Sequence, residues 1–331
     1  MHSTSCPATR CLLAIAVAVC AALGAVNALA QAYPVKPVRI LIGQPPGGVQ
    51  DTLLRGLIQD LTRVWGQAVV MENRVGGTGA IAAVAAARAA PDGYTIFFST
   101  STNMNTAQFL QKDLPYHPEK DFIPVVGMGQ TKSIMVAGNH VPANSVRELV
   151  ALGKAKPGVL NYGSFGVGSA AHLDAEAFAR VAGFKAVHVP YKSGPAVMTA
   201  LLAGEVDFGL TGLTAAIPLV NAGKLKGLAY TGEQRASAVP QVPTLAEAGY
   251  GGFDSGGMFA LYVPTGTPQA ILDKIANDVT AIRSTQTFRE KILIANGMED
   301  LPLQGAALIA RFQKSREDFA TRVKGLDIVM N

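Results

Sequence analysis

Three loops rich in glycine, serine and threonine are the parts of this sequence that could hold a small ligand. They span residues 45–51 (Pro-Pro-Gly-Gly-Val-Gln-Asp), 99–103 (Ser-Thr-Ser-Thr-Asn) and 163–169 (Gly-Ser-Phe-Gly-Val-Gly-Ser), and each lies between a strand pattern and a helix pattern. Glycine lets the backbone approach a ligand closely, and the first turn of a helix presents unpaired N–H groups at its positive end. Three such loops together favour a site for a carboxylate or a phosphate over ordinary strand-to-helix turns.

The usual signatures of cofactor binding and catalysis are missing from the same loops. Gly166 to Ala171 matches the Gly-x-Gly-x-x-Ala fingerprint of dinucleotide-binding folds, but residues 186–190, where the ribose-binding acid would stand, contain no carboxylate. Residues 43–48 lack the Lys-Ser/Thr ending of a phosphate-binding loop, and no Gly-x-Ser-x-Gly elbow occurs. The histidines show no metal-ligand spacing, which argues against zinc. We therefore expect non-covalent chemistry without a cofactor or a metal.

Alternating strand and helix patterns must position these loops. Asp51 is expected as the N-cap of a helix with Leu53, Leu57 and Leu61 at helical spacing. Repeated strand–loop–helix units predict an α/β fold of parallel sheets with helices on both faces, and two such runs predict two lobes. The expected strands are 38–42, 68–71, 94–98, 159–162, 186–189 and 206–210, and later helices are expected at 145–155, 170–182, 195–202 and 214–222.

The first 30 residues have the pattern of a secretory signal peptide. A single basic residue, Arg10, precedes an apolar run over 11–26, and residues 28–30 (Ala-Leu-Ala) offer a small-x-small cleavage site. The run covers 16 residues, fewer than the roughly 20 of a spanning helix, which argues against a retained anchor. Val19 before Cys20 does not fit a lipid-anchor site. We expect cleavage after residue 30 and export to the periplasm.

The expected mature chain contains no cysteine, because all three cysteines lie within the first 20 residues. This excludes a disulfide scaffold, a cysteine nucleophile and thiolate metal sites. The whole chain has 28 Lys and Arg against 23 Asp and Glu, dispersed and without a basic run among aromatics, so a nucleic-acid partner is not expected. No second segment is apolar enough to span a membrane.

A series of short motifs runs through the mature chain in a fixed order. Each motif is weakly specific, but the ordered set is highly specific and covers nearly the whole mature chain. The motifs are Tyr33-Pro34-x-Lys36-Pro37-Val38-Arg39, Pro45-Pro46-Gly47-Gly48-x-x-Asp51 with Arg55, Gly66-Gln67-x-Val69-Val70-x-Glu72-Asn73-Arg74, Pro91-Asp92-Gly93-Tyr94-Thr95, Leu114-Pro115-Tyr116 with Lys120-Asp121-Phe122, Tyr162-Gly163-Ser164, His172-Leu173, His188-Val189-Pro190-Tyr191-Lys192, and Val242-Pro243-Thr244 with Glu247-Ala248-Gly249.

This ordered set resembles the substrate-binding proteins of tripartite tricarboxylate transporters, the Bug family of periplasmic receptors. The resemblance implies an α/β fold like type II periplasmic binding proteins: two parallel-sheet domains with a cleft between them. Lobe 1 is expected to comprise residues 31–130 plus 251–331, and lobe 2 residues 131–250. It also implies a small carboxylate held between the lobes, the membrane subunits of a transporter as partners, and a monomeric receptor without enzymatic activity.

The resemblance implies that both lobes supply ligand contacts, through loop amides, hydroxyls and bridging waters. Asp51 would organise its loop or contact a ligand amine, and His172 would contact the ligand or pack beside its own helix. The ligand-binding residues implied in this way are Pro46, Gly47, Gly48, Val49, Asp51, Ser99, Ser101 and Asn103 in lobe 1, and Ser164, Gly166, Gly168, Ser169, His172, Ser193, Pro195, Ala196 and Thr211 in lobe 2.

Three departures from the usual pattern of the family bear on the ligand. Ala200 stands where Asp is frequent, Met258 stands where Trp is frequent, and Phe165 places a bulky ring inside the third glycine loop. These changes remove one carboxylate and alter the apolar lining, which suggests an aromatic or longer-chain carboxylate. The alternative is that Met258 and Phe165 are core residues.

We expect a periplasmic solute-binding protein whose two lobes close over a small carboxylate. Two alternatives stay open from the sequence. One is a periplasmic sensor that presents a bound carboxylate to a signalling partner, and the other is a secreted hydrolase on the same fold. A hydrolase needs a clustered nucleophile and base, and the four scattered histidines of the mature chain give no support for one.

Overall fold

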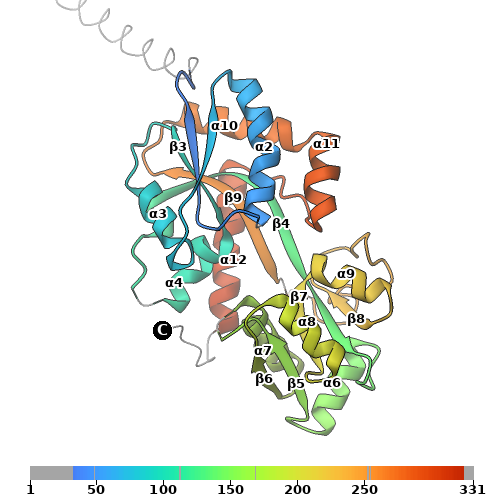
Figure 1. The fold of residues 1–331 in the computed structure, drawn as a ribbon. Helices are drawn as coiled ribbons and strands as arrows, with labels where there is room; N and C mark the ends of the chain where they lie inside the picture. Colours follow the sequence, from blue (N-terminus) through green and yellow to red (C-terminus); the bar gives the residue numbers. More distant parts are fainter. Residues whose placement is uncertain are drawn as a thin grey trace, which may run out of the picture.

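The computed structural model describes residues 33–47, 49–111, 113–167, 169–251, 253 and 255–323. In this part of the chain the strands follow the order β2-β1-β3-β9-β4-β7-β5-β6, and β8 pairs with β4. Figure 1 shows two lobes, with β4 and β9 running between them and α12 descending from the first lobe towards the second. The expected signal peptide and the three cysteines lie outside the described residues.

Lobe 1 is built on β1, β2 and β3, with β1 in the middle and parallel to both neighbours. Because parallel strands end at the same edge of a sheet, the loops that follow them meet there. The elements of this lobe are β1 (Val38–Ile42), α2 (Val49–Trp65), β2 (Val69–Asn73), α3 (Ala80–Ala87), β3 (Thr95–Thr100), α4 (Ala107–Leu110), α5 (Pro118–Asp121), β9 (Gly256–Pro264), α10 (Gln269–Arg283), α11 (Gln286–Phe288) and α12 (Gly305–Val323).

Lobe 2 repeats this arrangement on a smaller scale, with β5 parallel to both β6 and β7. The predicted helices are confirmed here to within one or two residues. The elements are the second half of β4 (Phe122–Gly138), α6 (Val146–Ala155), β5 (Leu160–Ser164), α7 (Ala170–Ala182), β6 (Ala186–Pro190), α8 (Gly194–Ala203), β7 (Phe208–Gly212), α9 (Leu213–Asn221) and β8 (Leu225–Tyr230).

Two antiparallel strands join the lobes. The 17-residue β4 pairs with β9 as far as Lys132, and from Ser133 onwards it pairs with β7 and β8. The strands approach closely where they cross: a Cβ atom added at Gly256, whose φ is +138°, would lie 2.0 Å from the carbonyl oxygen of Thr131. The parallel sheets within each lobe were predicted, whereas β9 and the continuous β4 were not. Register shifts near Gly127 break the alternation that reveals a strand.

The predicted apolar face of α2 is confirmed. Leu53, Leu57 and Leu61 are fully buried in a core that also contains α10 and the sheet. α2 begins at Val49, two residues before the predicted cap, so Asp51 lies in its first turn and is not the N-cap. The prediction of Asp51 as the cap was wrong because the chain already enters the helix directly after the turn at Gly47, whose φ is +88°.

Helices cover both faces of each sheet, as predicted. In lobe 1, α2 and α10 pack on one face, while α3 and α12 contribute Ala83 and Phe312 to a core on the other. In lobe 2, α7 places Phe178 on one face, while α8 and α9 place Val197 and Ala216 on the opposite face. Within the described residues, none of these helices combines the length and the apolar character needed to cross a membrane.

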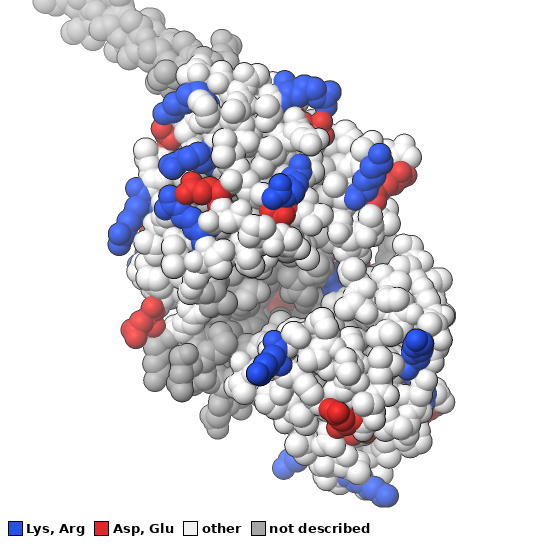
Figure 2. Space-filling view, in the orientation of Figure 1, with Lys and Arg blue, Asp and Glu red and all other residues white. Residues whose placement is uncertain are grey.

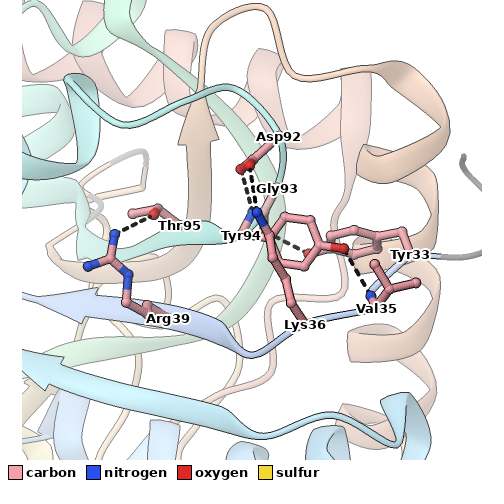
Figure 3. A network of polar contacts seen from close by, with 8 residues as sticks. All are labelled: Tyr33, Val35, Lys36, Arg39, Asp92, Gly93, Tyr94 and Thr95. Atoms are coloured by element: carbon pink, nitrogen blue, oxygen red, sulfur yellow. Dashed lines mark hydrogen bonds and ion pairs between the residues drawn. The ribbon is translucent and has the colours of Figure 1, made fainter.

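Two of the sequence motifs meet at the edge of lobe 1 where β1 and β3 begin (Figure 3). The hydroxyl of Tyr33 donates to the carbonyl of Gly93 at 2.7 Å, and that of Tyr94 accepts the amide of Val35 at 2.9 Å. Lys36 lies 4.2 Å from the centre of the Tyr94 ring. This is the amino-terminal edge of the strands, so these motifs fix the start of the sheet and lie away from the glycine loops.

Candidate functional site

A cavity of about 640 Å³ lies where the loops of both lobes meet the crossing strands. The space-filling view shows the surface hollowed between the lobes, with basic and acidic residues scattered over this face (Figure 2). The size is that of a typical small-ligand site. The cavity is lined by Gly43, Gln44, Pro45, Val49, Gln50, Val75, Gly76, Gly79, Ser99, Thr100, Thr102 and Asn103 of lobe 1, by Thr131, Lys132, Ser133, Gly256, Gly257 and Phe259 of the crossing strands, and by Phe165, Ala170, Ala171, Leu210 and Gly212 of lobe 2.

The first turn of α2 carries the most direct indication of a ligand. Gln50 is buried and lines the cavity, and its Nε2 donates to the carbonyl of Phe98 at 3.5 Å. Its Oε1 is buried and has no hydrogen-bond partner in the structure. A buried acceptor without a partner is costly, so this oxygen is placed to accept from a ligand or an ordered water. Gln50 was not among the predicted site residues, although it lies within a predicted loop.

Asp51 organises the loop that precedes α2. Its Oδ2 accepts the amide of Gly47 at 3.2 Å and the Nε of Arg55 at 2.8 Å. The hydrogen bond from Arg55 lowers the pKa of the buried Asp51 carboxyl, with a smaller contribution from the Gly47 amide. Of the two predicted roles, these contacts support loop organisation, because Asp51 does not line the cavity.

A second glycine loop in lobe 1 forms part of the wall. Gly79 has a φ of +97°, and a Cβ atom there would lie 2.2 Å from Nδ2 of Asn103. Asn103, a predicted site residue, accepts the hydroxyl of Thr100 on its Oδ1 at 3.1 Å. The loop over residues 76–79 was not predicted as part of the site. The signal was present, because it follows a strand that was expected to be parallel to β1 and therefore to end at the same edge.

The crossing strands supply the floor of the cavity. Of the described lining residues, Lys132 is the charged one, and its side chain is buried. Lys132 therefore gives the described lining of the cavity a positive charge, the sign that suits an anion. Sequence reasoning missed this residue, since nothing in the pattern around it showed that one strand passes from lobe to lobe.

The first turn of α7 forms part of the lobe 2 wall. Ser169 caps this helix, and its hydroxyl accepts the amide of His172 at 3.3 Å. The amides of Ala170 and Ala171 belong to the first turn, where no intrahelical acceptor exists, and both residues line the cavity. α7 therefore presents two donors and the positive end of a 13-residue helix to the cavity.

The polar residues predicted for lobe 2 are engaged inside the lobe. The hydroxyl of Ser164, which is fully buried, lies 2.6 Å from Nε2 of His188. The His188 ring stacks on His172 with centroids 3.8 Å apart and planes at 10°. Burial, aided by the neighbouring His172, lowers the pKa of His188 to about 4, and burial also lowers the pKa of His172 against the opposing effect of Glu176. Both rings are therefore neutral at neutral pH.

The predicted site residues differ in whether they line the cavity. Val49, Ser99 and Asn103 line the cavity. Others lie beside lining residues or serve local structure, as where Ser101 Oγ accepts the amide of Met258 at 3.0 Å and Ser193 Oγ accepts the amide of Ala196 at 3.4 Å. Residues that do not line the cavity are Pro46, Gly47, Asp51, Ser101, Ser164, Gly166, Ser169, His172, Ser193, Pro195, Ala196 and Thr211, while Gly48 and Gly168 lie outside the described residues.

The geometry offers binding groups more readily than reactive ones. Ser164 and His188 are a hydroxyl–imidazole pair, but the Ser164 side chain is fully buried and its oxygen also contacts the carbonyl of Gly166 at 3.0 Å. A nucleophile must reach its substrate, and this hydroxyl does not. In the described part of the chain, no three His, Cys, Asp or Glu side chains gather in a way that could hold a metal ion.

Two α/β lobes joined by crossing strands, with a ligand-sized cavity between them bordered by helix N-termini, define a solute-binding receptor. Residues 53–317 match the model of the tripartite tricarboxylate transporter family receptor. The chain belongs to this family of receptors, which includes the Bug proteins, and the expected family and fold class are confirmed.

Relatives and solved structures agree with this assignment. Protein BugT of Bordetella pertussis is 35% identical over 266 residues, covering 80% of this chain and 81% of BugT. Rpa4515 of R. palustris with adipate has a TM-score of 0.74 and 28% identity over 90% of this chain and 99% of its own. MatC of Rhodopseudomonas palustris with bound malate has a TM-score of 0.69 and 27% identity over 88% of this chain and 100% of its own. BugD, another solved relative, is described as a periplasmic binding protein.

Proposed function

We propose that this protein is a periplasmic receptor that captures a small carboxylate between its lobes for a tripartite tricarboxylate transporter. The observation that carries the proposal is the cavity at which the first turns of α2 and α7 meet, with Lys132 in its floor. Two helix N-termini and a buried ammonium group suit an anion. Two solved relatives hold adipate and malate, both carboxylates.

Capture proceeds by closure of the lobes. We place lobe 1 at residues 31–130 plus 251–331 and lobe 2 at residues 131–250, which is supported by the change of partners of β4 between Lys132 and Ser133. The hydroxyl of Tyr230 in lobe 2 donates to Oε1 of Glu299 in lobe 1 at 2.7 Å, a contact between the lobes outside the cavity lining. A ligand that contacts donors of both lobes favours the closed arrangement over the open one.

The same proposal covers the compartment and the partners. Residues 1–30 are a signal peptide that is cleaved, and the mature receptor works in the periplasm as a monomer that delivers its ligand to the membrane subunits of the transporter. It needs no cofactor, does not bind nucleic acid and has no enzymatic activity.

A sensor that presents the ligand to a signalling partner remains the second candidate. Loss of ligand uptake in a deletion strain supports transport, whereas intact uptake with a lost transcriptional response supports sensing.

One backbone donor provides a sharp test. Ala170→Pro removes the first N–H of α7 while keeping the helix, because proline fits this position and Ser169 already has the extended conformation (φ −65°, ψ 156°) that proline requires before it. We expect carboxylate binding, measured by calorimetry, to weaken about 10- to 100-fold, which corresponds to one charge-assisted hydrogen bond. Gln269→Pro is the matched control, since it makes the same change at the exposed first residue of α10, which does not line the cavity.

The ligand panel for this test contains small carboxylates and their neutral methyl esters. Carboxylates should raise the melting temperature of the purified protein and esters should not. Equal binding of esters, or the absence of any thermal shift with every carboxylate, contradicts the proposal.

A further inference from the structure

The two sides of the cavity differ in their side chains. Apart from residues of the crossing strand β4, the described lining residues of lobe 2 are Phe165, Ala170, Ala171, Leu210 and Gly212, and none of these five has a polar side chain. Lobe 1 and the floor contribute several hydroxyls and amides, among them Ser99, Asn103 and Gln50. A ligand in the cavity therefore meets polar side chains on one side and a hydrocarbon surface, interrupted only by the backbone amides of α7, on the other.

Phe165 has the largest side chain of this hydrocarbon surface, and its ring packs against α8. The side chain is half-buried and packs on the core that contains Val197 of α8. A Cβ atom added at Gly194, the first residue of α8, would lie 3.9 Å from Cδ1 and Cε1 of the ring. The ring thus packs against α8 on one side and lines the cavity on the other.

The other two departures, Ala200 and Met258, lie inside the protein. Ala200 is buried in a lobe 2 core and Met258 in a lobe 1 core, and neither lines the cavity. Only Phe165 therefore changes the surface that a ligand would touch. A second charged group of the ligand placed against Phe165 and Leu210 would lose its water without gaining a partner, whereas an apolar group there would gain from burial.

We propose that the captured carboxylate has an apolar body the size of a phenyl ring or a medium-length alkyl chain, which packs against Phe165 and Leu210 while its carboxylate lies at the first turn of α7. The inference rests on the proposed capture of a carboxylate and specifies the class of ligand. Phe165 is then the residue that determines specificity for the body of the ligand.

Calorimetric titrations of the purified protein with four probes test this inference: phenylacetate, hexanoate, succinate and citrate. Phenylacetate or hexanoate should bind at least about tenfold more tightly than either polyanion, the effect of burying one or two apolar groups. Phe165→Ala should weaken phenylacetate binding about tenfold and leave succinate unchanged, while Phe165→Leu should retain most of the affinity. Val189→Ala is the control, because Val189 packs on the same core without lining the cavity.

The possible outcomes test the apolar ligand class, the role of Phe165 and carboxylate capture separately. Tighter binding of succinate or citrate overturns the apolar class while leaving carboxylate capture intact. Equal weakening by Phe165→Ala and Val189→Ala, for all probes, overturns the role of Phe165, since it shows an effect of the core alone. If none of the probes and no member of the wider carboxylate panel binds, both the ligand class and the capture function fail.

Discussion

The two walls of the interlobe cavity are built from loops of similar composition, yet they use their polar residues differently. In lobe 1, Ser99, Asn103 and Gln50 line the cavity, and Gln50 keeps a buried acceptor without a partner. In lobe 2, Ser164 is paired with His188 and Ser169 caps α7, so both stabilise the loop from inside. A Gly-Ser loop can therefore be a ligand surface or a supporting structure, and only its contacts distinguish the two.

A glycine-to-alanine pair compares the walls most directly and has the largest expected effect. Gly79→Ala in lobe 1 should lower the free energy of unfolding by about 1–3 kcal/mol, because the position has a left-handed φ of +97° and a Cβ atom would collide with Asn103. Carboxylate affinity should fall with it, as Asn103 is displaced. Gly212→Ala in lobe 2 should change stability by less than about 0.5 kcal/mol, since a Cβ atom there has nothing within 4 Å. Denaturant unfolding and calorimetry measure both, and equal effects would remove the contrast.

The supporting contact of lobe 1 is tested by Asp51→Asn. This change weakens the hydrogen bonds to Gly47 and Arg55, and we expect a loss of roughly 1 kcal/mol of stability, mainly from the loop amide, because Arg55 is exposed and screened by solvent. Asp60→Asn is the control on the same helix, where an exposed pair with Arg63 contributes little. Urea unfolding distinguishes them. A control variant that loses as much stability as Asp51→Asn would contradict the loop-organising role.

Acidification should loosen the supporting contacts of lobe 2 before those of lobe 1. The pKa of His188 is lowered from 6.5 to about 4, so the unfolded chain takes up a proton more readily than the folded chain between these values. The stabilising contribution is complete above pH 6.5 and is lost as the pH falls towards 4. Asp51, whose pKa is lowered from 3.8, keeps its contribution until the pH falls below that value.

Thermal unfolding between pH 7 and pH 4 measures the loss of stability on acidification. We expect it to be smaller than the effects of Gly79→Ala and Asp51→Asn, because His188 is only half-buried. His188→Gln should flatten the decline, while His117→Gln, at an exposed histidine, should leave it unchanged. A decline of the same size in His188→Gln would assign the acid sensitivity to other groups.

The local structure followed closely from the sequence. Leu53, Leu57 and Leu61 lie on the buried face of a helix because apolar residues at this spacing must share one side. The α7 span of Ala170–Ala182 matches the prediction, with Ser169 as cap and Gly183 in the left-handed conformation after it. Asp51 shows the limit: the residue type suits a cap, but the helix had already begun at Val49.

The composition of the site was harder to predict. Val49, Ser99 and Asn103 were expected near a strand-end ligand surface, and they line the cavity. Lys132 was missed because it lies on a strand that crosses between the lobes. Its place beside the cavity depends on the pairing of this strand with a segment more than 120 residues away. Local patterns do not carry such long-range pairings.

By itself, the sequence determined the parallel α/β units, the loops that end their strands, and the family to which the chain belongs, because periodicity and ordered motifs are local properties. The tertiary structure decided which loop residues face the cavity. Phe165 and Met258 were equivalent in the sequence as unusual apolar residues, but Phe165 follows the end of β5 and lines the cavity, whereas Met258 lies within β9 and is buried in the core. Side-chain direction in a sheet reverses with every residue, so it is fixed only once the strands have paired.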